Sequence, residues 1–103
     1  MTDLYKLNSQ SFAEQLHTSF KVQNGEGPPI ALELAEVKEP PSPPSIELFC
    51  LLFRGPVSPR LRQQIHRFEH EKLGALDLFL TVIGADEGGT SYEVIFHRVP
   101  PKP

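Results

Sequence analysis

The sequence predicts an all-β fold, a small antiparallel six-stranded barrel or sandwich with one short N-terminal helix. Several segments alternate apolar and polar residues, and residues that alternate in this way point to opposite faces of a strand. The chain also contains 11 prolines and 7 glycines, which fall in clusters between those segments. Because such clusters mark turns and loops, the ordered segments are expected to be short.

The length of the chain, 103 residues, allows one domain with one hydrophobic core. We expect an N-terminal segment over residues 1–10 and a single β domain over residues 11–99. Residues 100–103 contain three prolines and are expected to form a disordered tail.

Charge and composition argue against several classes of partner. The net charge is −3 at pH 7 and the basic residues are scattered, so neither nucleic acid nor an anionic membrane is expected to bind. No apolar run approaches the ~20 residues that a membrane helix needs, and the N-terminus lacks the apolar region of a signal peptide. The single cysteine cannot form an internal disulfide. We therefore expect a cytoplasmic protein.

The one helix is expected over residues 11–17. Ser11 and Glu14 have the spacing of a capping box, in which each side chain accepts a hydrogen bond from a backbone amide at the start of the helix. Phe12 and Leu16 would then pack on the barrel.

The first two strands are expected on either side of a loop over residues 24–29. The first begins with Phe20–Val22, and the second alternates apolar and polar or small residues over Ile30–Val37. The segment 39–45 is rich in proline, which donates no amide, so we expect an extended surface loop there.

The longest apolar run, residues 46–53, predicts a central strand buried on both faces. Glu47 is its one polar residue, and the turn signal Gly55-Pro56 follows it. At about 25 cal/mol per Å² of apolar area removed from water, this run would be the largest local source of folding free energy.

Residues 57–74 are compatible with a helix or with a strand. Ser58-Pro59 suit the N-cap and first position of a helix, and Gly74 suits its end. The alternative is a strand over residues 64–70, which would place on one face the side chains of His66, Phe68 and His70.

The last two strands are expected over residues 75–83 and 92–97, where the period-two pattern is clear. Residues 84–91 are rich in glycine and are expected to form the loop between them.

Six short phrases of the chain, taken in order, resemble a family of small bacterial domains catalogued as a domain of unknown function. The phrases are Leu51–Pro56, Phe68–His70, Leu73-Gly74, Leu78–Leu80, Ile83-Gly84 and Tyr92–Phe96. The resemblance implies a small antiparallel β domain with no assigned reaction. It also implies genes that often lie beside genes for phage tail-collar-like fibre proteins.

The same resemblance favours the strand over residues 64–70. The family has glycine in place of Gln64 and proline in place of Glu71, and both residues disfavour a helix. Residues 71–74 are then expected to form the turn of a hairpin.

The segment His66–His70 matches H-x-x-E-H, a zinc-protease motif in which Glu69 would act as the base. On a helix, the two histidines lie one turn apart and can share a zinc ion. On a strand they lie about 13 Å apart, at ~3.3 Å per residue, which is too far for zinc–nitrogen bonds near 2 Å. With the strand preferred, a zinc hydrolase through His66, Glu69 and His70 is a remote alternative.

Four further features are interpreted as structural. Cys50 lies in the apolar run and is expected to behave as a small hydrophobe. Lys38–Pro44 fits a proline pattern that SH3-type grooves accept, and Gly84–Gly89 lacks the ligand spacing of a calcium loop. Arg54 and Glu93 are expected to form a structural ion pair.

The leading hypothesis for function is a non-enzymatic interaction module, because the sequence contains no catalytic constellation. It would serve as an accessory, adaptor or assembly chaperone for a phage-tail-like fibre protein, with no cofactor and no metal. A strand of the partner, or of a second copy, would pair with an open edge at Phe20–Val22 or Ile30–Val37. The alternative is a small-ligand-binding β-barrel, which needs a cavity inside the barrel.

Overall fold

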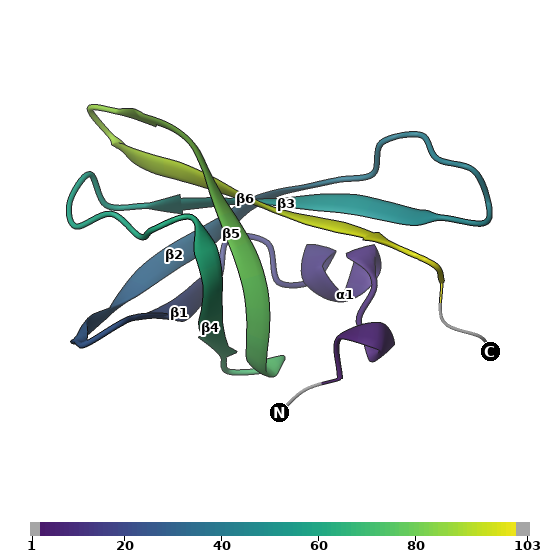
Figure 1. Ribbon diagram of the computed structural model, residues 1–103, viewed down its shortest axis with the longest axis horizontal. Helices are drawn as coiled ribbons and strands as arrows, with labels where there is room; N and C mark the ends of the chain where they lie inside the picture. The colour runs from purple at the N-terminus through teal and green to yellow at the C-terminus, as the bar shows by residue number, and fades with distance from the viewer. Residues whose placement is uncertain (1–2, 101–103) are drawn as a thin grey trace.

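Six antiparallel strands close into a barrel in the computed structural model, which describes residues 3–100 (Figure 1). The strand order around the barrel is β1-β2-β3-β6-β5-β4, and β1 pairs with β4 to close it. The strands are β1 (Ser19–Asn24), β2 (Gly27–Lys38), β3 (Glu47–Gly55), β4 (Gln64–His70), β5 (Gly74–Asp86) and β6 (Gly89–Arg98). The predicted all-β fold with six strands is confirmed as a barrel. The predicted tail lies outside the described residues, except for Pro100.

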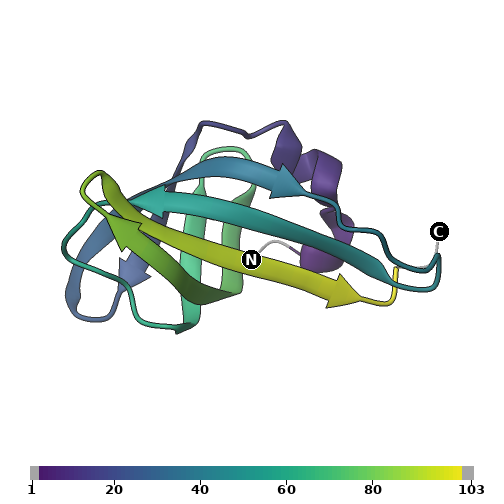
Figure 2. The same cartoon turned by 90° about the horizontal axis from the view of Figure 1, so that it is seen from above.

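Two short helical elements precede the strands, a 3-10 turn η1 (Leu4–Lys6) and the helix α1 (Ser9–Ala13). No helix within residues 3–100 has the length and apolar character needed to span a membrane. Seen from above, β2, β3 and β6 run side by side over much of their length (Figure 2).

The short helix is confirmed, but it begins earlier than predicted. The side chain of Asn8 accepts a hydrogen bond from the Ser11 amide at 3.0 Å, and Ser11 Oγ accepts one from the Asn8 amide at 3.1 Å. Asn8 is therefore the N-cap, and Glu14 lies at the C-cap. Phe12 is fully buried, as predicted, whereas Leu16 follows the helix and is 36% exposed, so its predicted packing is wrong.

The first hairpin turn is shorter than the predicted loop over residues 24–29. Gly25-Glu26 alone join β1 to β2, and Pro28-Pro29 belong to β2. The prolines are tolerated because the ladder with β1 is irregular opposite them, and because β2 pairs with β3 only from Glu33 onward.

The strand β3 buries one face fully and the other in part. Phe49, Leu51 and Phe53 point into the barrel and are at most 1% exposed, whereas Leu48 and Leu52 are half-buried. The predicted burial on both faces is therefore wrong for the outer face. In a closed barrel each strand has two neighbours, so β3 is not central either.

The strand β4 matches the predicted span and excludes a helix over residues 57–74. After it, Gly74 has φ +80°, a left-handed conformation that favours glycine. The predicted glycine-rich loop over residues 84–91 is wrong, since β5 and β6 continue through it and leave Glu87-Gly88 as the turn.

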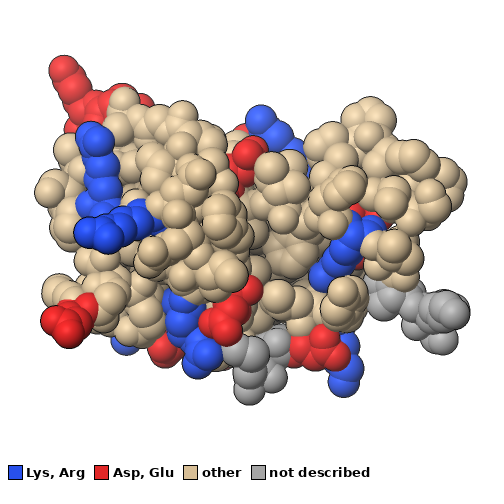
Figure 3. Space-filling model, in the orientation of Figure 1, with Lys and Arg blue, Asp and Glu red and all other residues tan. Residues whose placement is uncertain are grey.

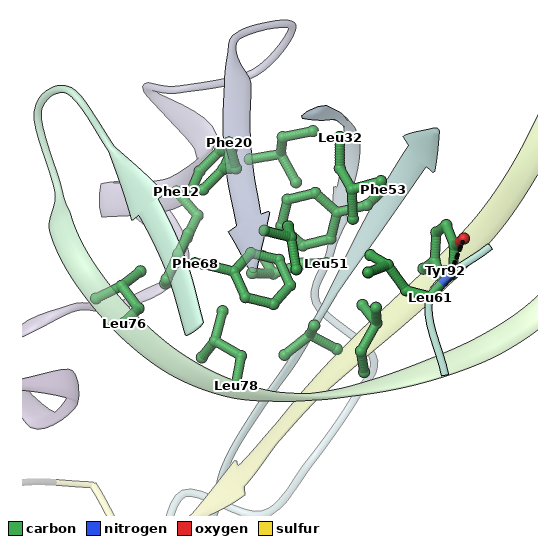
Figure 4. Packing of buried hydrophobic residues seen from close by; sticks show 14 of the residues in the cluster. Phe12, Phe20, Leu32, Leu51, Phe53, Leu61, Phe68, Leu76, Leu78 and Tyr92 are labelled. Carbon is green, nitrogen blue, oxygen red and sulfur yellow. Dashed lines mark hydrogen bonds between the residues drawn. The ribbon is translucent and has the colours of Figure 1, made fainter. Parts of the chain in front are cut away.

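The interior of the barrel is filled by apolar side chains from all six strands and from α1 (Figure 4). Phe20, Phe53 and Phe68 form its aromatic centre, with ring centroids 5.2 to 6.4 Å apart. Tilted and edge-on aromatic pairs add about 0.5–1.5 kcal/mol each beyond their burial. The buried hydroxyl of Tyr92 accepts a hydrogen bond from the Leu61 amide at 3.0 Å, which ties the loop before β4 to β6.

Candidate partner-binding groove

The strands β5 and β6 pair only near the hairpin that joins them. Their ladder begins with Asp86 and Gly89 and ends with Thr81 and Glu93. Beyond this point β5 pairs with β4, whereas β6 pairs with β3. Figure 1 shows the two strands diverging, with α1 lying toward the space between their far ends. The barrel is closed near the hairpin, but no ladder joins the two strands beyond this point, and we call this stretch the open seam.

A groove of about 240 Å³ lies in the open seam. Its walls are the edges of β5 and β6, and η1 contributes to one end. The lining residues are Leu4, Tyr5, Asp77, Leu78, Phe79 and Val94–Arg98. Figure 3 shows this face of the molecule, where uncharged atoms cover a broad area over β5 and β6.

Large apolar side chains are exposed beside the groove. Phe79 and Ile95 stand on its two rims and are 53% and 55% exposed. Ile65 in β4 is 65% exposed and pairs with Phe79 in β5. Ile83 lies further along β5 and is 49% exposed. We call these four residues the apolar wall. Exposed apolar clusters of this kind are typical of interaction sites.

The two charged side chains in the groove lining already have partners within the protein. Asp77 pairs with Arg67 at 2.8 Å, and Arg98 pairs with Glu47 at 2.6 Å. Among residues 3–100, the groove lining therefore offers no unpaired charge to a ligand, which suits an uncharged occupant.

Arg98 also fixes the N-terminal segment to the end of the groove. Its guanidinium donates hydrogen bonds to the carbonyl oxygens of Leu4, at 2.8 Å, and Leu7. The same group lies 5.4 Å from the ring centre of Tyr5 and 5.1 Å from that of Phe96, within the range of cation–π attraction. Arg98 thus helps to hold η1 at the end of the groove, together with the packing of Leu4 and Leu7 against the core.

The seam between β1 and β4 is short but closed. Within the described residues, the backbone ladder consists of Lys21 with Glu69 and Val22 with Phe68. Neither β1 nor β2 is an edge strand, because each pairs with two neighbours. The predicted open edges at residues 20–22 and 30–37 are therefore wrong.

The histidines of the H-x-x-E-H motif reinforce this short seam. His66 Nδ1 lies 3.0 Å from the carbonyl oxygen of Gln23 in β1, and His70 Nε2 lies 2.8 Å from Thr18 Oγ1 just before β1. Both rings are nearly buried, 5% and 8% exposed. The two imidazoles therefore hold β4 to β1 on either side of the two backbone pairs.

The same geometry separates the three residues of the zinc hypothesis. His66 and His70 point into the barrel, whereas Glu69 is exposed and accepts a hydrogen bond from Gln23 Nε2 at 2.9 Å. The remaining ring nitrogens are also engaged, with Arg62 O and with the amides of residues 72 and 73. Within residues 3–100, no three His, Cys, Asp or Glu side chains are grouped so as to hold a metal ion.

The hydrogen bonds of His70 define its neutral form. Nδ1 accepts from the amides of Lys72 and Leu73, at 3.0 and 3.2 Å, and so carries no proton, while Nε2 donates to Thr18 Oγ1. The Thr18 hydroxyl donates its own proton to the carbonyl oxygen of Gln15, at 2.7 Å. Desolvation on burial lowers the pKa of His70, the charge of Lys72 adds to this, and Glu71 opposes it.

Arg54 pairs with Asp86 and not with Glu93, contrary to the prediction. Its guanidinium bonds Asp86 and donates to Ser91 Oγ at 2.7 Å. The hydrogen bond from Arg54 is the main cause that lowers the pKa of Asp86. Asp86 reaches Arg54 because β5 extends through the predicted loop, whereas Glu93 lies opposite Leu52.

The other sequence candidates do not line the groove, although Cys50 pairs across the β3–β6 ladder with Ile95. Cys50 is 9% exposed in β3, where burial, and secondarily Glu93, raise the pKa of its thiol, with Lys38 acting in the opposite direction. The segment 39–45 is exposed between β2 and β3. A ligand inside the barrel would compete with the buried core, and the groove is smaller than the ~300–1,000 Å³ of typical small-molecule sites.

The comparison with known families assigns the chain to a family. A family profile described as "Domain of unknown function (DUF6916)" matches residues 7–96. The chain belongs to the DUF6916 family. The match confirms the resemblance to a domain of unknown function, and its span includes both histidines of β4 and most of the groove. The search of curated proteins and the search of solved structures gave no match for this DUF6916 chain.

The groove was missed at the sequence level, although one signal for it was present. In residues 75–83 the face opposite the core contains Phe79 and Ile83, which are large apolar residues where an exposed strand face normally has polar ones. Ile95 repeats the feature in the last strand. Large apolar residues on the outer face of a barrel are typical of interaction surfaces.

Proposed function

We propose that this DUF6916 domain is a non-enzymatic interaction module that binds a partner protein through its apolar wall. The supporting observation is the exposure of Ile65, Phe79, Ile83 and Ile95, each between 49% and 65%, on three neighbouring strands. Fully burying one such side chain contributes about 1.5–3 kcal/mol, so four of them can provide the core of an interface.

The partner that we propose is a phage-tail-like fibre protein of a bacterial system, for which the domain acts as an accessory, adaptor or assembly chaperone in the cytoplasm. The resemblance of the six sequence phrases to a bacterial family whose genes neighbour tail-collar-like fibre genes supports this choice. The groove lining without unpaired charge fits a protein partner better than a nucleic acid or an anionic membrane.

The test is co-purification of the domain with the fibre protein encoded beside its gene. The double variant Phe79→Ser and Ile95→Ser is expected to weaken binding at least about tenfold, because interface centres depend on a few large apolar side chains. Both side chains are more than half exposed, so the variant is expected to fold.

The matched control is Val57→Ser, which removes an apolar side chain that is 44% exposed in the loop between β3 and β4. This variant should bind as the wild type does. A clean negative with both wild-type proteins soluble would refute the proposed function, as would equal binding by all three forms.

A further inference from the structure

We propose that the groove between β5 and β6 accepts an extended, uncharged segment of the partner, which adds as a strand to the edge of β6. This inference rests on the proposed function, since it names the chemistry by which the partner is held. The occupant is a single peptide segment and not a folded surface.

The hairpin geometry determines which backbone groups of β6 face the groove. A two-residue turn joins Asp86 to Gly89, which pair directly across the hairpin. From Gly89 onward, every second residue of β6 directs its N–H and C=O toward β5. This series reaches Ile95 and His97, which lie past Glu93, where the ladder with β5 ends.

The ladder with β5 does not reach Ile95 and His97. Within residues 3–100, no backbone hydrogen bond from η1, a turn or a loop reaches them either. By contrast, Val94 and Phe96 alternate with them and face β3. Unpaired groups at a strand edge are a template for another strand.

The chemistry of the groove selects an uncharged segment with alternating apolar residues. Both charged lining residues are compensated within the protein, and Phe79 and Ile95 form apolar rims on either side. In a strand, alternate side chains of the occupant would contact these rims while its amides and carbonyls meet the edge of β6.

A segment from a second copy fits less well. Of the two long segments between the strands of this chain, residues 39–46 contain four prolines and residues 56–63 contain two. Proline has no amide to donate, so both segments are poorly suited to complete a ladder. The strands of a second copy already belong to its own closed barrel.

The test is selection from a phage-displayed library of random peptides, followed by synthesis of the enriched sequence. We expect uncharged, alternating sequences. In hydrogen exchange measured by NMR, the bound peptide should slow the exchange of the Ile95 and His97 amides at least about tenfold. Methylation of the peptide amides that face β6 should weaken binding at least about tenfold, because it removes the backbone donors.

A matched pair of variants distinguishes the contribution of the His97 backbone amide to binding from that of the His97 side chain. His97→Pro removes one groove-facing amide near the end of β6, a position at which an edge strand tolerates proline, and should abolish binding. His97→Ala keeps the amide and should bind at least about tenfold more tightly than His97→Pro does. If His97→Pro fails to fold, the methylated peptide provides the same comparison on the wild-type protein.

Several outcomes would overturn the inference. The first is that no peptide is enriched, and the second is that the methylated peptide binds as well as the unmethylated one. The third is that, without peptide, the amides of Ile95 and His97 exchange more slowly as the protein concentration rises, which would indicate a second copy. If the fibre protein binds in a Phe79-dependent way while the two amides stay unprotected, the strand-addition inference fails and the proposed function stands.

Discussion

At the scale of single residues, the histidines of β4 show how a catalytic motif can serve structure. In H-x-x-E-H, helical geometry would bring both imidazoles to one metal with the glutamate beside them as the base, but a strand turns the glutamate away from both imidazoles. His66 and His70 instead form hydrogen bonds that join β4 to the chain around β1. Their chemistry is used to close the barrel where the backbone ladder is short.

The state of His70 predicts a loss of stability in mild acid. The folded protein holds His70 neutral with a lowered pKa, while the unfolded chain binds a proton near the ordinary value of 6.5. As the pH falls below that value, the unfolded state binds more protons, so the free energy of unfolding decreases until the folded pKa is passed. Urea unfolding of the wild type between pH 7.5 and pH 5, roughly the histidine range, measures this decrease.

The control for this prediction is His70→Gln, which removes the titrating group and keeps a polar side chain. Its unfolding free energy should vary less with pH over the same range, because the other histidines are unchanged. A variant whose profile parallels that of the wild type would show that His70 is not responsible.

At the scale of elements, the hairpin of β5 and β6 extends beyond its expected length and packs on the end of β3. Gly89 makes this packing possible, since a Cβ atom there would lie 2.3 Å from the carbonyl oxygen of Gly55. Its φ of +155° is also a conformation that other residues rarely adopt. The position of Asp86 beside Arg54 follows from the same hairpin.

Gly89→Ala is therefore expected to destabilise the protein by about 1–3 kcal/mol, the usual cost of backbone strain. Gly84→Ala is the matched control in the same hairpin, because its added Cβ would meet no atom within 4 Å, and it should change stability by less than ~0.5 kcal/mol. Thermal or urea unfolding of both variants measures the difference. Similar stability of the two would refute the close approach of Gly89 to β3.

The strands β2 and β6 each extend past one neighbouring strand, and the consequences differ. Where β2 runs beyond β1, Leu34 exchanges hydrogen bonds with His17 and Thr18, and α1 lies against the strand. Where β6 runs beyond β5, the groove is left with lining side chains but no backbone partner within residues 3–100. This contrast makes the edge of β6 the better candidate for a partner strand.

At the scale of the whole molecule, local patterns were sufficient to predict five strands and the burial of Phe12, because period-two alternation and breakers act within a few residues. The strand over residues 64–70 is also confirmed, but local patterns left a helix open there and the family resemblance decided the choice. The turns were less predictable. Both hairpins over residues 24–29 and 84–91 are tighter than predicted, since glycines and prolines fit inside strands at irregular ladder positions.

The groove and the ion pair of Arg54 could not be predicted, because both depend on where two strands stop pairing. That point is determined by the shear of the closed barrel and by the hairpin register, and not by residues near in sequence. The outward Phe79 and Ile95 were visible in the sequence, but their position on facing rims required the structure.

The open seam is the central claim, and residue-by-residue amide exchange of the free protein tests it most directly. Along β6 we predict an alternation past Glu93, in which Val94 and Phe96, paired with β3, exchange at least about tenfold more slowly than Ile95 and His97. Equal protection of all four amides would show that the seam is closed and would contradict the account.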